Sequence, residues 1–255
     1  MFGAKQPSTI SIIFRLASLI IKQENAAATA AIGQNKSSSS SPSSSGSKNN
    51  SFSGFWEKAE ERKIEALNLY HQVLNAYKNA PNYGPVHPDT LNVVIVLSDL
   101  YYQQNLPTDA VELLERAMVA CERALSLGKD AHVTMNMTFE TAKMYRKIGN
   151  CLQAGLLLSR IRKWQSKQML DEGSREVLRI RGEVALVHVD MRQFNEGFQL
   201  LKVLIPLYER ELGQCHIETL NILSSMTRCY LGLLATRKDT NVNDDGLSIG
   251  NSLSC

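Results

Sequence analysis

A small residue recurs along this chain at nearly constant spacing, and that spacing constrains the fold more than any other feature. The residues are Ala66, Ala110, Ala154 and Gly197, which are separated by 44, 44 and 43 positions. Four positions after each of the last three stands a leucine: Leu114, Leu158 and Leu201. A period of roughly 20–50 residues indicates a repeat architecture, in which each unit buries its apolar face only against its neighbours.

Each repeat has the pattern of two antiparallel helices, here called helix A and helix B. Helix A opens near four anchor residues: Thr90, Thr134, Val177 and Thr219. Small residues stand at position +8 after each anchor in helix A and at +20 in helix B, so the two helices of a pair can approach closely. Larger residues at +7, +11 and +24 fill the layers around that contact. We therefore expect an all-α, right-handed solenoid of three full helix hairpins, with an extra helix at each end.

The connectors before helix A share a second pattern. Three of them place Gly six residues before Thr, with His between: Gly84–His87–Thr90, Gly128–His132–Thr134 and Gly213–His216–Thr219. Glycine suits a left-handed helix end, and Asp or Thr suits the N-cap of the next helix. The third repeat departs from this pattern, because it opens with Asp171-Glu172-Gly173-Ser174 and lacks the His and Thr.

This arrangement of small and large residues resembles the tetratricopeptide repeat, with a period longer than the family's usual length of about 34 residues. The Gly–His–Thr connector resembles the kinesin-light-chain type, which also occurs in fungal nucleotide-binding regulators with repeat tails. The resemblance covers about residues 56–237 and implies a non-catalytic scaffold for protein partners. The Asn pair that lines the cargo groove of kinesin light chains is absent; the first repeat has Ile95 and Val96 there.

Composition divides the chain into four parts. Residues 1–24 form an amphipathic segment, 25–55 a Ser-rich disordered linker, 56–237 the helical repeat domain and 238–255 a disordered tail. In the first segment one helix face carries Ser8, Ser11, Arg15, Ser18 and Lys22. This amphipathic segment, which has no acidic residue before Glu24, fits a helix packed on the first repeat, a mitochondrial presequence or a membrane-surface anchor.

Motifs for chemistry are missing from the sequence. It contains no Gly-rich phosphate loop, no Gly-x-Ser-x-Gly and no His-Glu-x-x-His, and its five cysteines form no Cys-x-x-Cys pair. A net charge of +3 is too small to favour nucleic acid, and no uncharged apolar run is long enough to span a membrane. We expect no enzyme activity, no cofactor, no metal, no nucleic-acid partner and no transmembrane span. We expect a cytoplasmic protein, with mitochondria as the alternative.

What remains is a binding surface. Solenoids commonly bind partners on the concave side, where positions +2, +5, +9, +12 and +13 of helix A point inward. These positions hold five cationic residues and two acidic ones, which favours an acidic, extended or helical partner segment. The residues expected to bind it are Asn92, Asn136, Lys143, Arg146, Arg179, Asn221 and Arg228.

Three functional hypotheses follow. The first is an interaction scaffold, the second a mitochondrial assembly factor targeted by residues 1–24, and the third a fragment of a larger nucleotide-binding regulator. The last helix A, at about 216–236, has no helix B after it. Its outer face therefore exposes apolar residues, and we expect self-association or capping by a partner at this end.

Overall fold

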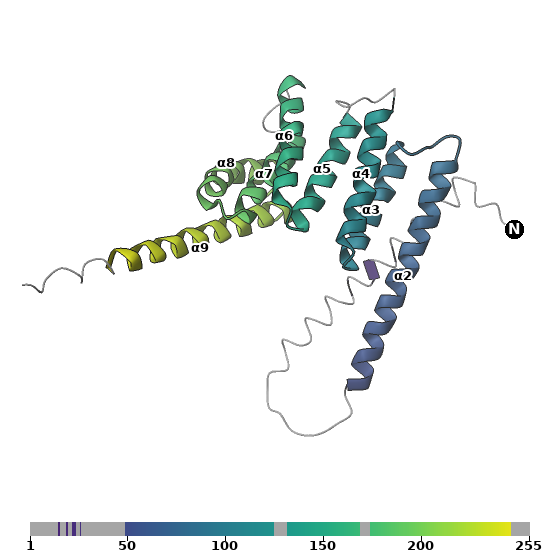
Figure 1. Cartoon of the computed structure of the whole chain (residues 1–255), viewed down its shortest axis with the longest axis horizontal. Helices are drawn as coiled ribbons and strands as arrows, with labels where there is room; N and C mark the ends of the chain where they lie inside the picture. The colour runs from purple at the N-terminus through teal and green to yellow at the C-terminus, as the bar shows by residue number, and fades with distance from the viewer. Residues whose placement is uncertain are drawn as a thin grey trace, which may run out of the picture. The chain divides into compact units, whose positions relative to one another are not determined.

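The computed structural model describes residues 49–124, 132–168 and 174–245, together with five helical residues nearer the N-terminus: Arg15, Leu19, Lys22, Gln23 and Ala26. Within these residues all regular secondary structure is helical (Figure 1), which confirms the expected all-α class. The helices are α2 (Asn49–Asn79), α3 (Pro88–Gln103), α4 (Pro107–Arg123), α5 (His132–Lys147), α6 (Cys151–Gln168), α7 (Arg175–Asp190), α8 (Phe194–Leu212) and α9 (Ile217–Asp245).

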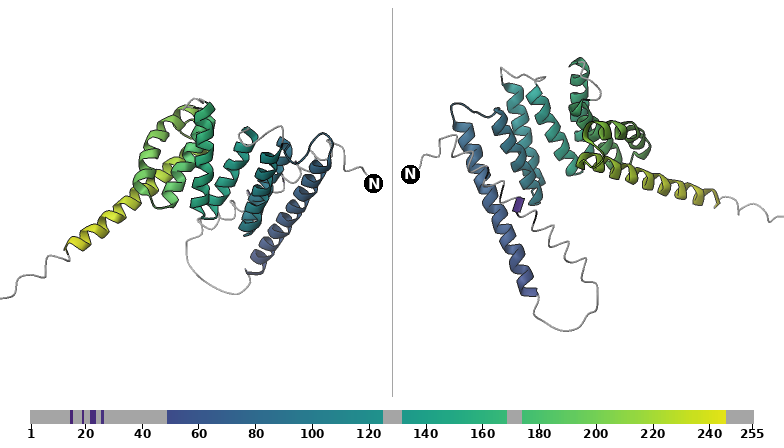
Figure 2. Two further views of the ribbon diagram at one scale, coloured as in Figure 1. Left: turned by 45° about the horizontal axis from the view of Figure 1, so that its top comes forward. Right: turned by 180° about the vertical axis from the view of Figure 1, so that it is seen from behind.

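The chain divides into two compact units, residues 1–128 and 129–255. In the first unit α3 packs between α2 and α4. In the second unit each helix from α5 to α9 packs on the next one, and α7 also contacts α5 and α9. The views in Figure 2 show successive helices of each unit running antiparallel. Both units are therefore built from the helix hairpins that the repeat spacing predicts.

The recurrent small residues lie where helices approach most closely. Ala66, Ala110 and Ala154 are fully buried. A β-carbon added to Gly197 would lie 3.0 Å from Val189 Cγ2 and 3.4 Å from Cys229 Sγ. The periodic positions thus mark contacts with no room for a larger side chain, as expected from the sequence.

Helix α7 is buried on two faces. Ile180 and Val187 join a core cluster formed mainly by α5 and α6, whose larger members include Met135, Phe139, Leu158, Ile161 and Trp164. Leu178 and Val189 join a second cluster formed with α8 and α9, whose members include Leu201, Leu204, Tyr208 and Ile222. Because α7 contributes to both clusters, it fixes the helices on either side of it, which carry most of the candidate site.

The conformation of the connectors differs from the sequence prediction. Gly84 and Gly213 have positive φ values of 129° and 93°, which favour glycine, but ψ at Gly213 is 157°, so this helix end does not have the predicted left-handed helical conformation. The N-cap, however, is His rather than Asp or Thr, because His87 Nδ1 accepts from the Asp89 N–H at 3.2 Å and His216 Nδ1 accepts from the Glu218 N–H at 3.2 Å. Thr219 lies inside the first turn, fully buried, where its hydroxyl donates to the Gly213 carbonyl at 2.9 Å.

Two helix boundaries also differ from the prediction. Helix α2 begins at Asn49, inside the interval predicted as linker, and α9 continues to Asp245, past the predicted domain end at 237. Once a helix is nucleated, each added residue gains a hydrogen bond. No Gly or Pro interrupts the sequence between Gly232 and Gly246. The rest of the predicted linker and tail, and most of residues 1–24, fall outside the described residues.

Candidate functional site

Six of the seven predicted site residues belong to the second unit. Asn136, Lys143 and Arg146 lie on α5, Arg179 lies on α7, and Asn221 and Arg228 lie on α9. The seventh, Asn92, is an exposed residue of α3 in the first unit. The site described below consists of the second-unit residues.

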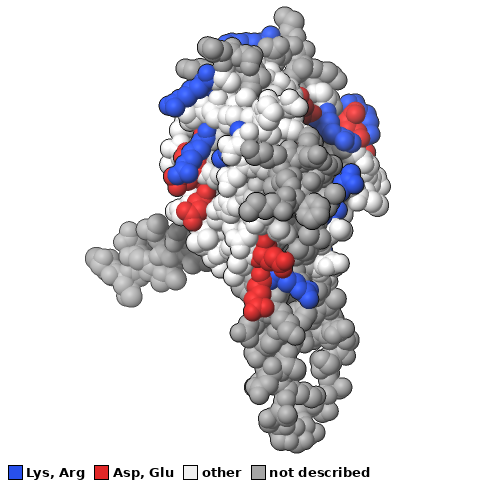
Figure 3. All heavy atoms as spheres, turned by 90° about the vertical axis from the view of Figure 1, so that its right-hand side faces the viewer, with Lys and Arg blue, Asp and Glu red and all other residues white. Residues whose placement is uncertain are grey.

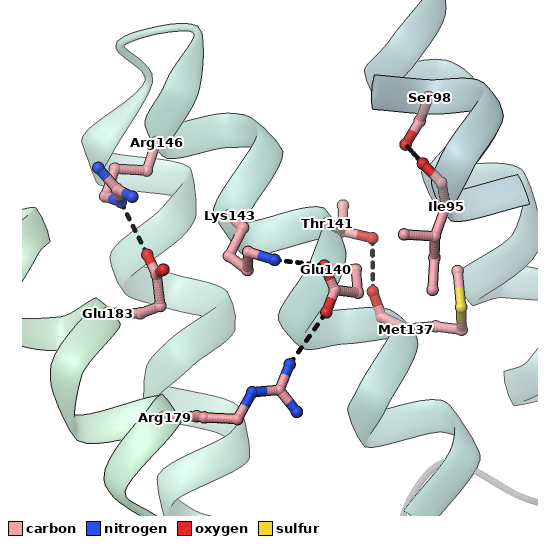
Figure 4. A network of polar contacts seen from close by, with 9 residues as sticks. All are labelled: Ile95, Ser98, Met137, Glu140, Thr141, Lys143, Arg146, Arg179 and Glu183. Atoms are coloured by element: carbon pink, nitrogen blue, oxygen red, sulfur yellow. Dashed lines mark hydrogen bonds and ion pairs between the residues drawn. The ribbon is translucent and has the colours of Figure 1, made fainter. Parts of the chain in front are cut away.

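Glu140 of α5 lies between two of the predicted cations (Figure 4). Its carboxylate accepts from Lys143 Nζ at 2.8 Å and from Arg179 at 3.2 Å. Both cations also lie near the Phe139 ring, with the Arg179 guanidinium 4.8 Å and Lys143 Nζ 5.7 Å from its centroid. These contacts hold two long, flexible side chains in place, one from each of two helices.

Arg146 forms the centre of a second group of charges. Its guanidinium donates to Glu183 at 2.7 Å and to Asp190 at 3.1 Å, and Asp190 also pairs with Arg228 of α9 at 2.9 Å. Burial acts to lower the pKa of Arg146, but its contacts with Glu183 and Asp190 outweigh burial and raise it. Ion pairs therefore join α5, α7 and α9 on one surface.

The exposure of these side chains separates the two signs of charge. The carboxylates of Glu140, Glu183 and Asp190 are 12, 14 and 21% exposed. Three of the cations are more open, since Lys143, Arg179 and Arg228 are 30, 37 and 54% exposed. The carboxylates thus lie beneath the cations and orient them toward solvent.

The positive charge of this surface is smaller than the sequence count suggests. That count used five inward positions of helix A and left out Glu140 and Glu183 at position +6. The structure pairs both with the predicted cations, so four cations face three carboxylates in the network. Figure 3 shows a different face, the right-hand side of Figure 1, and there too acidic and basic side chains of the described residues are interspersed.

A small hollow of about 110 Å³ opens beside the Glu140 group. Its polar lining includes Lys143, Arg179, Glu183, Glu218 and Asn221, and its apolar lining includes Phe139, Leu186 and Ile222. Pockets for cofactors and drug-sized ligands are larger, at about 300–1,000 Å³. The hollow therefore suits one or two side chains of another protein.

The hollow also contains residues that sequence reasoning did not select. Gly182 lies at its wall, where a β-carbon would overlap the phenol of Tyr208. Tyr208 donates to the Leu178 carbonyl at 2.8 Å, and burial raises the pKa of this phenol, which keeps it a neutral donor. A glycine inside a helix was the available signal, because such a residue commonly has a packing reason.

The described residues contain no group of three or more His, Cys, Asp or Glu side chains placed to hold a metal ion. No helix in the described ranges is both long and apolar enough to cross a membrane. The features that do converge on this surface are paired charges, exposed amides and a small hollow.

Residues 90–133 match the family model of the tetratricopeptide repeat. This interval is one whole period, from the anchor Thr90 to the residue before the next anchor, Thr134. The chain carries tetratricopeptide repeats. The match confirms the resemblance inferred from the spacing of small residues, and the other tetratricopeptide-type hairpins of the chain repeat the same positions.

The tetratricopeptide region is similar in fold to solved kinesin-light-chain repeats. The kinesin light chain nearly identical TPR-like repeats of Podosopora anserina match with a TM-score of 0.52 and 22% identity, covering 72% of this chain and 85% of that chain. BtubC (BKLC) from P. vanneervenii matches with a TM-score of 0.54 and 17% identity, covering 76% of this chain and 74% of that chain. At these identities the likeness establishes the fold.

A curated relative adds a different kind of information. The Clustered mitochondria protein homolog of Neosartorya fischeri is 22% identical over 169 residues, which are 66% of this chain. The chain spans only 12% of that relative's length.

Proposed function

We propose that this chain is a non-catalytic interaction scaffold that holds an acidic segment of a partner protein against the α5–α7–α9 surface. The observation that carries the proposal is the layered arrangement of charge on this surface. Lys143, Arg179 and Arg228 project beyond Glu140 and Asp190, the carboxylates that orient them.

The arrangement leaves binding capacity on the cations. A guanidinium has five N–H donors, and the contacts of Arg179 and Arg228 with their carboxylates use only part of them. A partner carboxylate can therefore accept a charge-assisted hydrogen bond from a side chain that is already ordered. Preorganisation of this kind lowers the entropic cost of binding.

Two exposed amides and the hollow add recognition of shape. Asn221 of α9 and Arg179 line the hollow described above. Asn136 of α5 and Arg179 line a second, smaller hollow, so both amides lie near Arg179. Amide side chains can donate to and accept from a partner backbone with little demand on its sequence. The hollow next to Phe139 and Leu186 would accept one apolar side chain of the bound segment.

The test uses the full chain and three matched, fluorescently labelled 15-residue peptides of alternating Leu and Ser with four Glu, four Gln or four Lys residues. Fluorescence anisotropy should show the Glu peptide binding most tightly and the Lys peptide most weakly. The variant Lys143→Gln with Arg179→Gln should lose most of this preference. Because it takes both cations from Glu140, circular dichroism and urea unfolding check that it remains folded. Arg116→Gln with Arg210→Gln removes the same charge from exposed helix positions and should not change binding.

Arg146 is left intact in this test for a structural reason. Its removal would leave Glu183 and Asp190 facing each other without a cation, and breaking a buried pair destabilises proteins by about 3–5 kcal/mol. Loss of binding in an Arg146 variant would therefore not separate recognition from folding. Equal binding of the Glu and Gln peptides to the unmodified chain would overturn the proposal.

A second candidate function is a role at mitochondria. The name of the curated relative, Clustered mitochondria protein homolog, supports it, as does the amphipathic pattern of residues 1–24, which has no acidic residue before Glu24. Of that segment the structure describes Arg15, Leu19, Lys22 and Gln23, all helical and exposed. A fusion of residues 1–35 to a fluorescent protein should accumulate in mitochondria, and diffuse fluorescence would exclude targeting by this segment.

A further inference from the structure

A second hollow surface lies on another face of α7, between α6 and α8. These two helices each pack against α7 but not against each other, so α7 forms the floor of a groove. Two hollows of about 540 and 270 Å³ occupy it, and both are lined by Arg162 and Val184. The hollows are therefore parts of one continuous groove, here called the α6–α8 groove.

The dimensions of the groove match a short helix. It follows α6 from Cys151 to Arg162, which at 1.5 Å per residue is about 16 Å, or about three helical turns. Its floor includes Val184 and Val187 of α7. A helix laid in such a groove contacts it through side chains spaced three and four residues apart.

The rims of the groove are apolar and exposed. Leu152 and Leu156 on α6 are 71 and 65% exposed, and Val203 on α8 is 63% exposed. Leu200 lies on the same side of α8 and is also exposed. Isolated exposed leucines are common on protein surfaces, but apolar side chains gathered along both rims of a groove mark an interaction site.

The charges along the groove have one sign. No Asp or Glu lines either hollow, whereas Arg162 and Arg181 line the end shared with α8. Helix α6 itself contains no acidic residue but carries Arg160, Arg162, Lys163 and Lys167. An occupant with carboxylates near this end would therefore be complementary to the groove.

We propose that the α6–α8 groove binds a short amphipathic helix of a partner protein, about three turns long, with an apolar stripe in the groove and carboxylates beside Arg162 and Arg181. Residues 8–22 of this chain are an amphipathic alternative, but they carry Arg15 and Lys22 and no acid. Like charges disfavour that segment as the occupant. The proposal uses a different surface from the α5–α7–α9 site and does not depend on it.

Two cysteines allow binding to be located within the full chain. Cys151 lines the groove, whereas the exposed Cys215 lies in the connector before α9 and lines neither hollow. The probes are two 14-residue helical peptides with leucines at i, i+3, i+7 and i+10, which carry a Glu pair at the N-terminal or at the C-terminal end. The controls are scrambled peptides and versions with Lys in place of Glu. Alkylation of each cysteine by N-ethylmaleimide is followed by mass spectrometry.

We expect one of the two acidic peptides to slow alkylation of Cys151 while Cys215 reacts at its usual rate. Leu156→Asp places a charge in the apolar rim and should weaken binding of the peptide by about tenfold or more. Arg162→Gln should reduce the preference for Glu over Lys, because Arg181 remains beside the groove. The variant Lys143→Gln with Arg179→Gln should bind as the unmodified chain does, which separates this site from the α5–α7–α9 surface. Circular dichroism checks that each variant is folded.

Three results would overturn the proposal. The first is that neither acidic peptide protects Cys151, and the second is that the scrambled peptides protect it equally well. The third is that Cys151 reacts slowly in the free chain and faster when Ile12→Asp and Ile13→Asp are introduced. That outcome would show residues 8–22 of the chain itself in the groove.

Discussion

Gly182 of α7 lies directly against the phenol of Tyr208 in α8. A β-carbon at Gly182 would overlap the tyrosine hydroxyl and lie 3.4 Å from Ile222 Cδ1. The same hydroxyl donates to the Leu178 carbonyl at 2.8 Å, and Tyr208 is buried. Three helices of the second unit therefore meet at a position where only glycine fits.

We predict that Gly182→Ala lowers the free energy of unfolding by about 1–3 kcal/mol, because the tyrosine must move and weaken its buried hydrogen bond. Urea unfolding measures the change. Gly155→Ala is the matched control, since a β-carbon at Gly155 meets nothing within 4 Å. There the substitution should stabilise α6 by up to about 1 kcal/mol. If Gly182→Ala instead raises the free energy of unfolding, the contact between Gly182 and Tyr208 is not tight.

Ala154 tests the register of the repeats. It is fully buried in the cluster with Leu158 and Ile161, so Ala154→Leu should overpack this contact and cost about 1–3 kcal/mol. Gln153→Leu places the same side chain at the exposed neighbouring position, and it should change the free energy of unfolding by no more than about 0.5 kcal/mol. Equal melting temperatures for the two variants would show that position +20 is not the closest approach of the hairpin.

His71 gives the first unit a dependence on pH. Its Nε2 lies 2.7 Å from the Tyr101 hydroxyl, and burial, assisted by Lys78, lowers its pKa. Because the folded state holds the neutral imidazole, its contribution to stability is complete above the unfolded pKa of about 6.5. It is lost as pH falls through the lower folded pKa. His71→Gln should therefore flatten the fall in stability between about pH 7 and pH 5, and an unchanged slope would contradict this.

The terminal helix α9 exposes a face that is covered in the earlier hairpins. At position +1, Leu91, Met135 and Leu178 are at most 4% exposed, whereas Leu220 is 48% exposed. At position +8 the last repeat likewise exposes Thr227, while Ser98, Ala142 and Ala185 are buried. This is the face that helix B covers in a complete hairpin.

We therefore predict self-association through α9. Light scattering should show a mass that rises with concentration, and Leu220→Glu with Leu231→Glu should keep the chain monomeric, because both leucines are exposed and lie outside the core. Lys202→Glu, an exposed substitution on α8, is the control. A strict monomer across a wide concentration range would contradict the prediction.

The fold was predictable because its determinants repeat. A small residue every 43–44 positions specifies the hairpin contact, and its burial at Ala110, Ala154 and Gly197 follows from close packing. The hairpin turns show what the sequence hides. They place Asn105, Gly149 and Arg192 at positive φ in equivalent positions, although only glycine adopts that conformation at low cost. The sequence therefore does not reveal that Arg192 adopts a positive φ, because arginine is not a residue typical of that conformation.

The site was only partly predictable, for a geometric reason. The pattern places Lys143, Arg146 and Arg179 on the inner helices, but it does not say which way Glu140 and Glu183 point, because position +6 lies at the edge of the inward face. The structure turns both carboxylates toward the cations. The count of charges in the sequence therefore overestimates the positive field at this surface. The field is still positive, because the cations are more exposed than the carboxylates.

The most direct test of the account is the association rate of the Glu peptide with the full chain, measured by stopped-flow fluorescence at increasing salt. Electrostatic steering is screened by salt, so the rate should fall as salt rises for the unmodified chain and for Arg116→Gln with Arg210→Gln. For Lys143→Gln with Arg179→Gln, the association rate at low salt should be lower and should depend less on salt. If this variant associates at the unmodified rate, or if no chain shows a dependence on salt, the α5–α7–α9 surface is not the binding site.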